Sequence, residues 1–150
     1  MFLRAVRPWQ RLLPIVLAIG IAGCGGSKEP AVSAPASNLP PCANAGPAVT
    51  LPSEFPNSFP LPPGTVITST QRTERGAIVV SGFIPMEFKN VVAFFQSKLP
   101  AAGYKLLEGD AEMDEAESTF SGQGFQGKWK VNGILNCPGA VTLTVALWKS

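Results

Sequence analysis

The sequence predicts an α+β fold: an antiparallel sheet of about five to six strands with one helix packed on one face, in the order ββαββββ. Three observations support this prediction. One segment, 88–99, repeats apolar residues at helical spacing. Segments on both sides of it alternate apolar and polar side chains, as half-buried strands do. Gly and Pro separate these segments, as expected for short turns.

Two strands are expected before the helix, at Thr65–Thr70 and Ala77–Ile84, with Gly76 in the turn between them. Pro100 lies in or just past the last helical turn, and Gly103 follows it. Phe94 falls off the apolar stripe; we expect a core aromatic covered by a loop, with an exposed contact as the alternative. The stripe itself consists of Phe88, Val91, Val92, Phe95 and Leu99.

Four strands are expected after the helix. The first three lie at Tyr104–Leu107, at Ser118–Ser121 and around Trp129, in residues 128–131. The last has the clearest alternation and follows Pro138-Gly139, which suits a type II turn. One face of this strand carries Val141, Leu143, Val145 and Leu147, and the other carries Thr142, Thr144, Ala146 and Trp148. The helix stripe is expected to pack on the valine and leucine face.

Residues 1–23 have the composition of a secretory signal peptide. Arg4, Arg7 and Arg11 precede an apolar run, Leu12 to Ile21, that ends in Ile21-Ala22-Gly23-Cys24. A helix that spans a bilayer needs roughly 20 apolar residues, so a cleaved signal is preferred to a permanent transmembrane anchor. The last four residues resemble the lipobox of bacterial lipoprotein precursors.

The lipoprotein resemblance implies that Cys24 receives a diacylglyceryl group on sulfur and that the chain is cut before it. The new amino group can then be acylated as well, for example by palmitate. Two or three acyl chains hold a protein firmly on a membrane without a spanning helix. The expected location is the cell membrane or outer membrane, on the side facing the periplasm or the exterior.

The remaining chain divides into a tether, 24–51, and a single domain, 52–150. The tether is rich in Gly, Ser, Ala and Pro and shows no periodicity. The stretch 55–64 is too rich in proline for a helix or a central strand. We expect Phe55, Phe59 and Leu61 to cover apolar surface at the domain edge, with a proline-motif ligand as the alternative.

Cys42 and Cys137 are the two cysteines outside the lipobox. In an exported protein an even number of cysteines usually means a disulfide, which here would fasten the end of the tether to the turn before the last strand. Two buried free thiols are the alternative. A zinc site would need carboxylate ligands as well, because the chain contains no His.

Charge and composition argue against several classes of function. The whole chain has a formal charge of +2, but after removal of the signal nine basic residues face ten acidic ones, a charge of −1. Nucleic-acid binding, which needs a basic patch, is therefore not expected. Without His a His-dependent catalytic triad cannot form. No enzyme activity and no cofactor are predicted, although a catalytic carboxylate pair stays open.

Three local patterns are better explained by structure than by chemistry. Gly122-Gln-Gly124-Phe-Gln-Gly127 matches the dinucleotide-binding glycine pattern, but a strand-like segment follows where that motif needs a helix, so a flexible hairpin loop is expected. The serines at 69, 81 and 121 are isolated hydroxyls. The acidic run is expected to be a solvated loop, with weak calcium binding as the alternative: Glu108, Asp110, Glu112, Asp114, Glu115 and Glu117.

The motifs Leu61–Ile67, Val91–Phe95 and Leu99–Tyr104 resemble a small domain of bacterial lipoproteins whose function is unknown, over about residues 55–150. The leading hypothesis is a lipid-anchored, non-catalytic binding domain with an unknown envelope protein or ligand as partner. The alternative is a carrier of a small apolar ligand between helix and sheet. A weaker alternative is an envelope hydrolase. The carrier cavity would be lined by Phe88, Phe95, Val79 and Trp129.

Overall fold

The computed structural model describes residues 38–150. This part of the chain holds one α-helix, six strands and a short 3-10 helix. The order of the strands and the helix is the predicted ββαββββ, which confirms the α+β fold class. The elements are η1 (Pro41–Ala43), β1 (Val66–Arg72), β2 (Ile78–Ile84), α1 (Phe88–Ala101), β3 (Lys105–Ala111), β4 (Glu115–Gly122), β5 (Phe125–Gly133) and β6 (Val141–Lys149).

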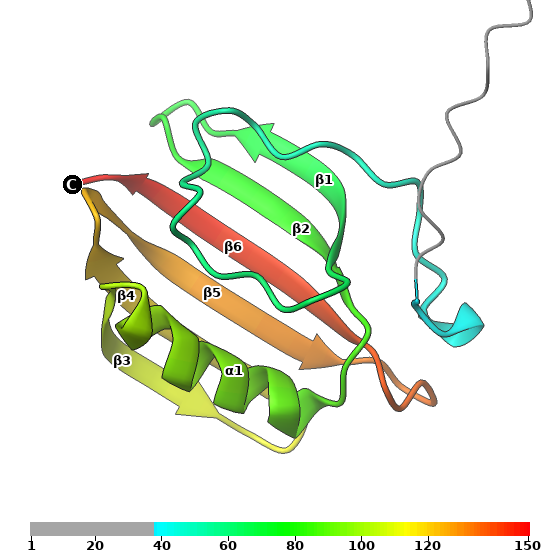
Figure 1. Cartoon of the computed structure of the whole chain (residues 1–150). Helices are drawn as coiled ribbons and strands as arrows, with labels where there is room; N and C mark the ends of the chain where they lie inside the picture. The colour runs from blue at the N-terminus through cyan, green and yellow to red at the C-terminus, as the bar shows by residue number, and fades with distance from the viewer. Residues whose placement is uncertain (1–37) are drawn as a thin grey trace, which may run out of the picture. The chain divides into compact units, whose positions relative to one another are not determined.

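The strands form one antiparallel sheet in the order β1-β2-β6-β5-β4-β3 (Figure 1). The C-terminal strand β6 lies between β2 and β5, and its pairing with β2 runs from Ile78 opposite Leu147 to Ile84 opposite Val141. Helix α1 carries the chain from β2 to the far side of the sheet, where β3 begins. As a consequence β1 and β3 are the two edge strands.

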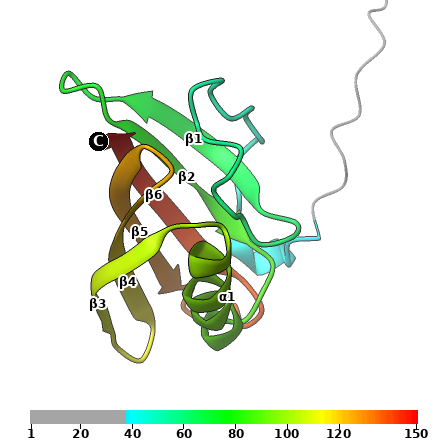
Figure 2. The same cartoon turned by 60° about the vertical axis from the view of Figure 1, so that its left-hand side comes forward.

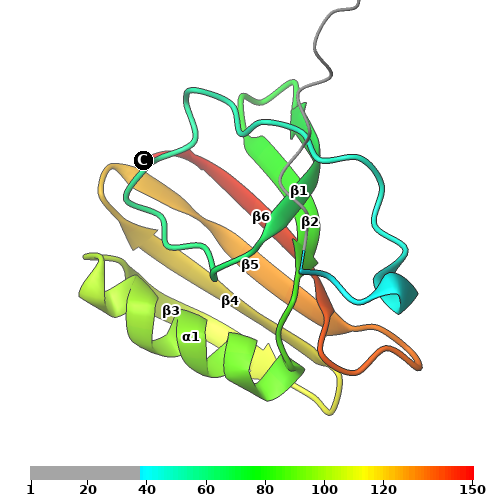
Figure 3. The same ribbon diagram turned by 45° about the vertical axis from the view of Figure 1, so that its right-hand side comes forward.

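One face of the sheet is covered in two parts. Helix α1 lies over the β3–β5 half, and residues 52–63 pass in front of β2 and β6 (Figures 1 and 3). Phe55 and Phe59 in this second cover are buried, and the Phe59 ring contacts those of Phe95 and Phe120 at centroid distances of 6.2 and 5.2 Å. The proline-rich segment is thus part of the core, more deeply buried than a cover at the domain edge.

The helix faces the sheet as its stripe predicts. Val91, Phe95 and Leu99 are fully buried, while Phe88 and Val92 are half-buried at the margins. These five side chains belong to the same core as the inward side chains of β6. The segment that lies directly over β6 is residues 52–63, however, and not α1. Pro100 is inside the last turn of the helix. Phe94 is half-buried at the flank of the core and meets the Phe95 ring edge to face at 5.7 Å.

The glycine-rich segment forms a tight hairpin. Gln123 and Gly124 connect β4 to β5 with φ angles of 55° and 78°, the positive values of a two-residue turn that matches strand twist. Gly127 lies within β5 and is buried between strands. The predicted hairpin is confirmed, with a turn of two residues instead of a longer loop.

The acidic run is not a loop, and this prediction is wrong. Glu108 and Asp110 lie in β3, Glu115 and Glu117 lie in β4, and only the residues between the strands form the turn. An exposed edge strand buries neither face well, so it lacks the apolar alternation by which strands are identified. Pairing with β4 determines the strand conformation here.

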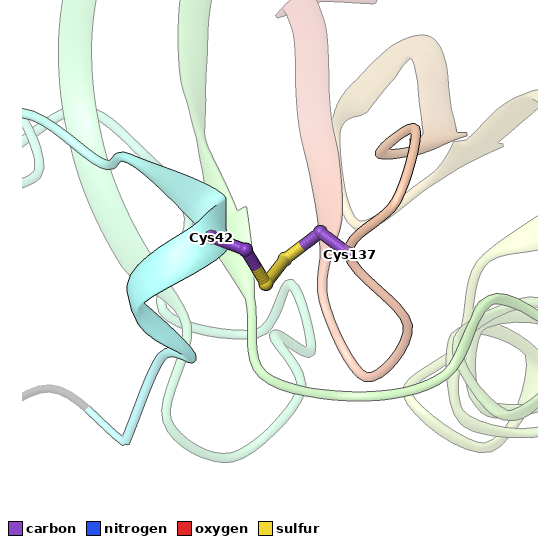
Figure 4. The surroundings of a disulfide bond; sticks show 2 residues. All are labelled: Cys42 and Cys137. Atoms are coloured by element: carbon purple, nitrogen blue, oxygen red, sulfur yellow. A yellow bond between two sulfur atoms is a disulfide. The ribbon is translucent and has the colours of Figure 1, made fainter.

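The end of the predicted tether lies against the domain. Cys42 and Cys137 form the predicted disulfide, with Cα atoms 5.4 Å apart (Figure 4). Ala43 and Cys137 are buried in a small second cluster that also contacts Phe83. Farther along, the Val49 N–H donates a hydrogen bond to the Ile67 carbonyl oxygen on the outer edge of β1, at 2.7 Å. The folded unit therefore includes residues 39–51.

Candidate functional site

The residues predicted to have a role are widely separated in the structure. Cys24 lies outside the described residues. Ser69 and Ser81 are cross-strand neighbours on β1 and β2, whereas Ser121 is on β4. Within residues 38–150 no three His, Cys, Asp or Glu side chains are grouped to hold a metal ion, and no helix there is long and apolar enough to cross a membrane.

The predicted carrier cavity between helix and sheet is not present where expected. Phe95 and Trp129, two of its proposed lining residues, stack on each other with ring centroids 4.9 Å apart and an angle of 23° between the planes. Both are buried, so their side chains fill the space. Val79 is on the opposite face of the sheet, because it is out of phase with its buried neighbours Ile78 and Val80.

A groove is present instead at the side of the helix, between α1 and the edge strand β3. Figure 2 shows how these two elements are arranged. We call it the α1–β3 groove; its volume is about 320 Å³. The helix contributes Val92 and Gln96 to its wall, and the floor includes Ser118 and Trp129. β3 forms the other wall with Leu106, Leu107, Gly109, Asp110 and Ala111.

Two features of the β3–β4 hairpin make room for this groove. Leu106 pairs with Phe120 and Gly109 with Ser118, so the two residues between them on β3 stand opposite Thr119 alone and form a bulge. A bulge bends its strand and increases the local twist. The residues that face α1 along this part of the hairpin are also small, including Gly109 and Ser118, and leave space that larger side chains would fill.

Trp129, one of the residues that line the groove, has a buried donor without an acceptor. Trp129 is 2% exposed, and its indole Nε1 has no hydrogen-bond partner among the described residues. The nearest hydroxyl in the floor, that of Ser118, donates to the Thr119 carbonyl oxygen at 3.0 Å. A buried N–H left unpaired costs about 1–3 kcal/mol, and because this atom has almost no exposed surface, an acceptor reaches it only if neighbouring side chains move.

The opposite face of the sheet, which we call the open face, carries charge near the same edge. Lys130 binds Glu115 at 2.8 Å, and Lys128 pairs with Glu117. Hydrogen bonds from Lys130 and then from Asn132 lower the pKa of Glu115, while the carboxylate of Glu115 raises the pKa of Lys130. These carboxylates are therefore neutralised by β5.

The acidic residues nearest the edge are not neutralised in this way. Asp110 stands opposite Glu117 on the open face, and Glu112 follows β3. In the described part of the chain neither Asp110 nor Glu112 forms an ion pair. The end of β3 at Asp110 and Glu112 is thus negatively charged, while the side of β3 toward α1 is lined by small and apolar residues.

A second hollow, of about 350 Å³, lies beside the disulfide and is open to solvent. Phe88, Ile134 and Pro138 are among its lining residues. None of its lining residues has a buried side-chain nitrogen or oxygen that lacks a partner. It is therefore a weaker candidate for selective binding than the α1–β3 groove.

The α1–β3 groove is not apparent from the sequence. One available signal was the alternation Glu108-Gly109-Asp110-Ala111-Glu112, in which acidic residues alternate with small ones at the period of a strand. Comparison of the chain with protein-family models, with curated proteins and with solved structures finds no match.

Proposed function

We propose that this protein is a lipid-anchored protein of the cell envelope whose domain binds a partner without catalysis. Cys24 attaches it to the membrane, and the domain faces the periplasm or the exterior. The observation that carries this proposal is the Cys42–Cys137 disulfide, since disulfides persist mainly in proteins exported from the reducing cytosol. It agrees with the signal pattern that ends at Cys24.

The disulfide also determines where the tether meets the domain. Its cysteines join η1 to the loop between β5 and β6 (Figure 4). A force applied at the lipid-anchored end is therefore borne by a covalent bond, and not by the hydrogen bond of Val49 to β1 alone. A domain held in this way can display a binding surface while it is tethered to a membrane.

The part of the proposal that concerns binding rests on the α1–β3 groove. A volume of about 300–1,000 Å³ is usual for a ligand site, and this groove is at the lower limit. The polar side chains of Gln96 and Ser118 on its wall and floor supply contacts of the kind that orient a ligand.

Replacement of Cys24 by Ala tests the anchor. The thiol is the proposed acyl acceptor, so Cys24→Ala should leave a precursor without the mass of the lipid and largely uncut. Cys42→Ala is the matched control and should keep the lipid. Intact-mass spectrometry of the membrane fraction measures both, and a Cys24→Ala protein with the same lipid-sized increment as wild type would disprove the anchor.

Carriage of a small apolar ligand is the second candidate function. The volume of the α1–β3 groove and the apolar side chains of Val92 and Leu106 favour it. Native mass spectrometry of protein purified from its own envelope would test it. The expected result for a carrier is a bound molecule that Val92→Trp displaces, whereas an empty protein would count against carriage.

A further inference from the structure

We infer that the free edge of β3 and the α1–β3 groove together bind an extended peptide segment of a partner protein, in which apolar residues alternate with basic ones. The segment adds to the sheet as a strand beside β3. This inference rests on the proposed function of the domain in binding and names its site and the chemistry of its partner.

The two edges of the sheet differ in protection. On β1 the Val49 N–H occupies the Ile67 carbonyl oxygen, and Pro52 lies close to the end of the strand. On β3 the outer edge has no backbone partner within residues 38–150. Six of its seven residues are exposed, and the side chain of Leu107 is 51% exposed. A free edge of this kind is a template for another strand.

The backbone N–H groups of β3 that are free to pair with an added strand can be identified. The Glu112 N–H donates to the Glu115 carbonyl oxygen, toward β4, at 2.7 Å. N–H groups alternate in direction along a strand, so those of Ala111 and Gly109 point outward. The Ala111 N–H is held by the Asp110 carboxylate at 2.9 Å, a contact on the surface that an incoming carbonyl group can replace.

The two faces of the edge require different side chains from an added strand. Side chains that point toward α1 would enter the α1–β3 groove, beside Val92 and Leu106. Apolar side chains fit there. Side chains on the other face would lie beside Asp110 and Glu112, whose carboxylates favour Lys or Arg. Alternation of apolar and basic residues satisfies both.

The same charges disfavour a second copy of this chain as the occupant. In the antiparallel register that places Ala111 opposite Ala111 of the other copy, Asp110 and Glu112 would face each other's carboxylates. Like charges at paired positions on adjacent strands are destabilising. The partner is therefore a different protein with a basic, extended segment.

Calorimetric titration of the mature, full-length protein in nonionic detergent tests the inference. The probe is a capped peptide of seven residues in which Val and Lys alternate. The controls are the peptide with Glu in place of Lys and the Val/Lys peptide N-methylated at alternate positions, which removes one edge of its N–H groups. We expect the Val/Lys peptide to bind at least tenfold more tightly than either control.

The position of the site is tested by hydrogen exchange and by charge reversal. Exchange should slow in residues 105–111 and stay unchanged in 66–72. The double variant Asp110→Lys, Glu112→Lys should prefer the Val/Glu peptide over the Val/Lys one. Glu74→Lys with Glu87→Lys, the same change of charge at exposed sites elsewhere, should keep the original preference.

Each contrary result has a defined meaning. Absence of binding by the Val/Lys peptide, equal binding of the three peptides, or protection outside 105–111 would overturn the inference. Protection of 105–111 that grows with protein concentration alone would show a second copy as the occupant and would also overturn it. The mass of the Cys24 lipid in the same sample tests the anchor separately, so failure of one proposal is distinguishable from failure of the other.

Discussion

Truncation of Phe95 to Ala tests the geometry on which the core depends. The side chain is fully buried, stacks on Trp129 at 4.9 Å and lies 6.2 Å from the Phe59 ring. Loss of a buried Phe side chain costs about 3–5 kcal/mol, and each aromatic pair adds about 0.5–1.5 kcal/mol. We therefore expect a loss of about 4–5 kcal/mol, a large part of the roughly 5–15 kcal/mol that stabilises a typical domain.

Phe94→Ala is the matched control, because it removes the same side chain one position earlier on α1. Phe94 is only half-buried and has a single aromatic contact. Partial exposure predicts a loss of about 1–2 kcal/mol. Guanidinium denaturation with an unchanged m value measures both losses. Equal losses would refute the reasoning, since they would mean that the helix is rotated and that Phe94 belongs to the core.

Replacement of both Cys42 and Cys137 by Ala should lower the free energy of unfolding by up to about 4–5 kcal/mol, because the disulfide spans 95 residues of sequence. Circular dichroism should still show the sheet at room temperature, and its loss would contradict an independent core. Gly127→Ala should lower the free energy of unfolding by about 1–3 kcal/mol, because the added Cβ would collide with a carbonyl oxygen of β6. Gly46→Ala is the control: an added Cβ there would meet no atom within 4 Å, so urea denaturation should show no measurable loss. The hydrogen bonds that lower the pKa of Glu115 stabilise the fold at pH values above the ordinary pKa of a carboxyl group. This stabilisation is lost as the pH falls through the lowered pKa. Glu115→Gln should therefore reduce the loss of stability between about pH 5 and pH 2, and an unchanged pH profile would exclude this ion pair as a cause.

The fold class follows from local pattern. The stripe that includes Val91, Phe95 and Leu99 and the alternation through β6 each identify an element and the face that it buries, because side-chain direction repeats with the period of the backbone. The pairing of Cys42 with Cys137 follows from cysteine count and from the signal pattern. The lipid on Cys24 stays a prediction.

Tertiary structure alone determines the candidate site. Insertion of β6 between β2 and β5 leaves β3 as a free edge, and strand order depends on pairing between distant segments. The bulge in β3 arises from a mismatch with β4, which no property of either strand taken singly reveals. Val79 lies on the face opposite to the predicted one. The segment around it is uniformly apolar, so its sequence does not show which side chains are covered, and the register with β6 decides this. The sequence by itself determined the helix, the strands and the cysteine chemistry. Contacts between distant elements determined the free edge at β3, the α1–β3 groove and the unpaired Trp129 Nε1, because each of these depends on which segments lie side by side in space.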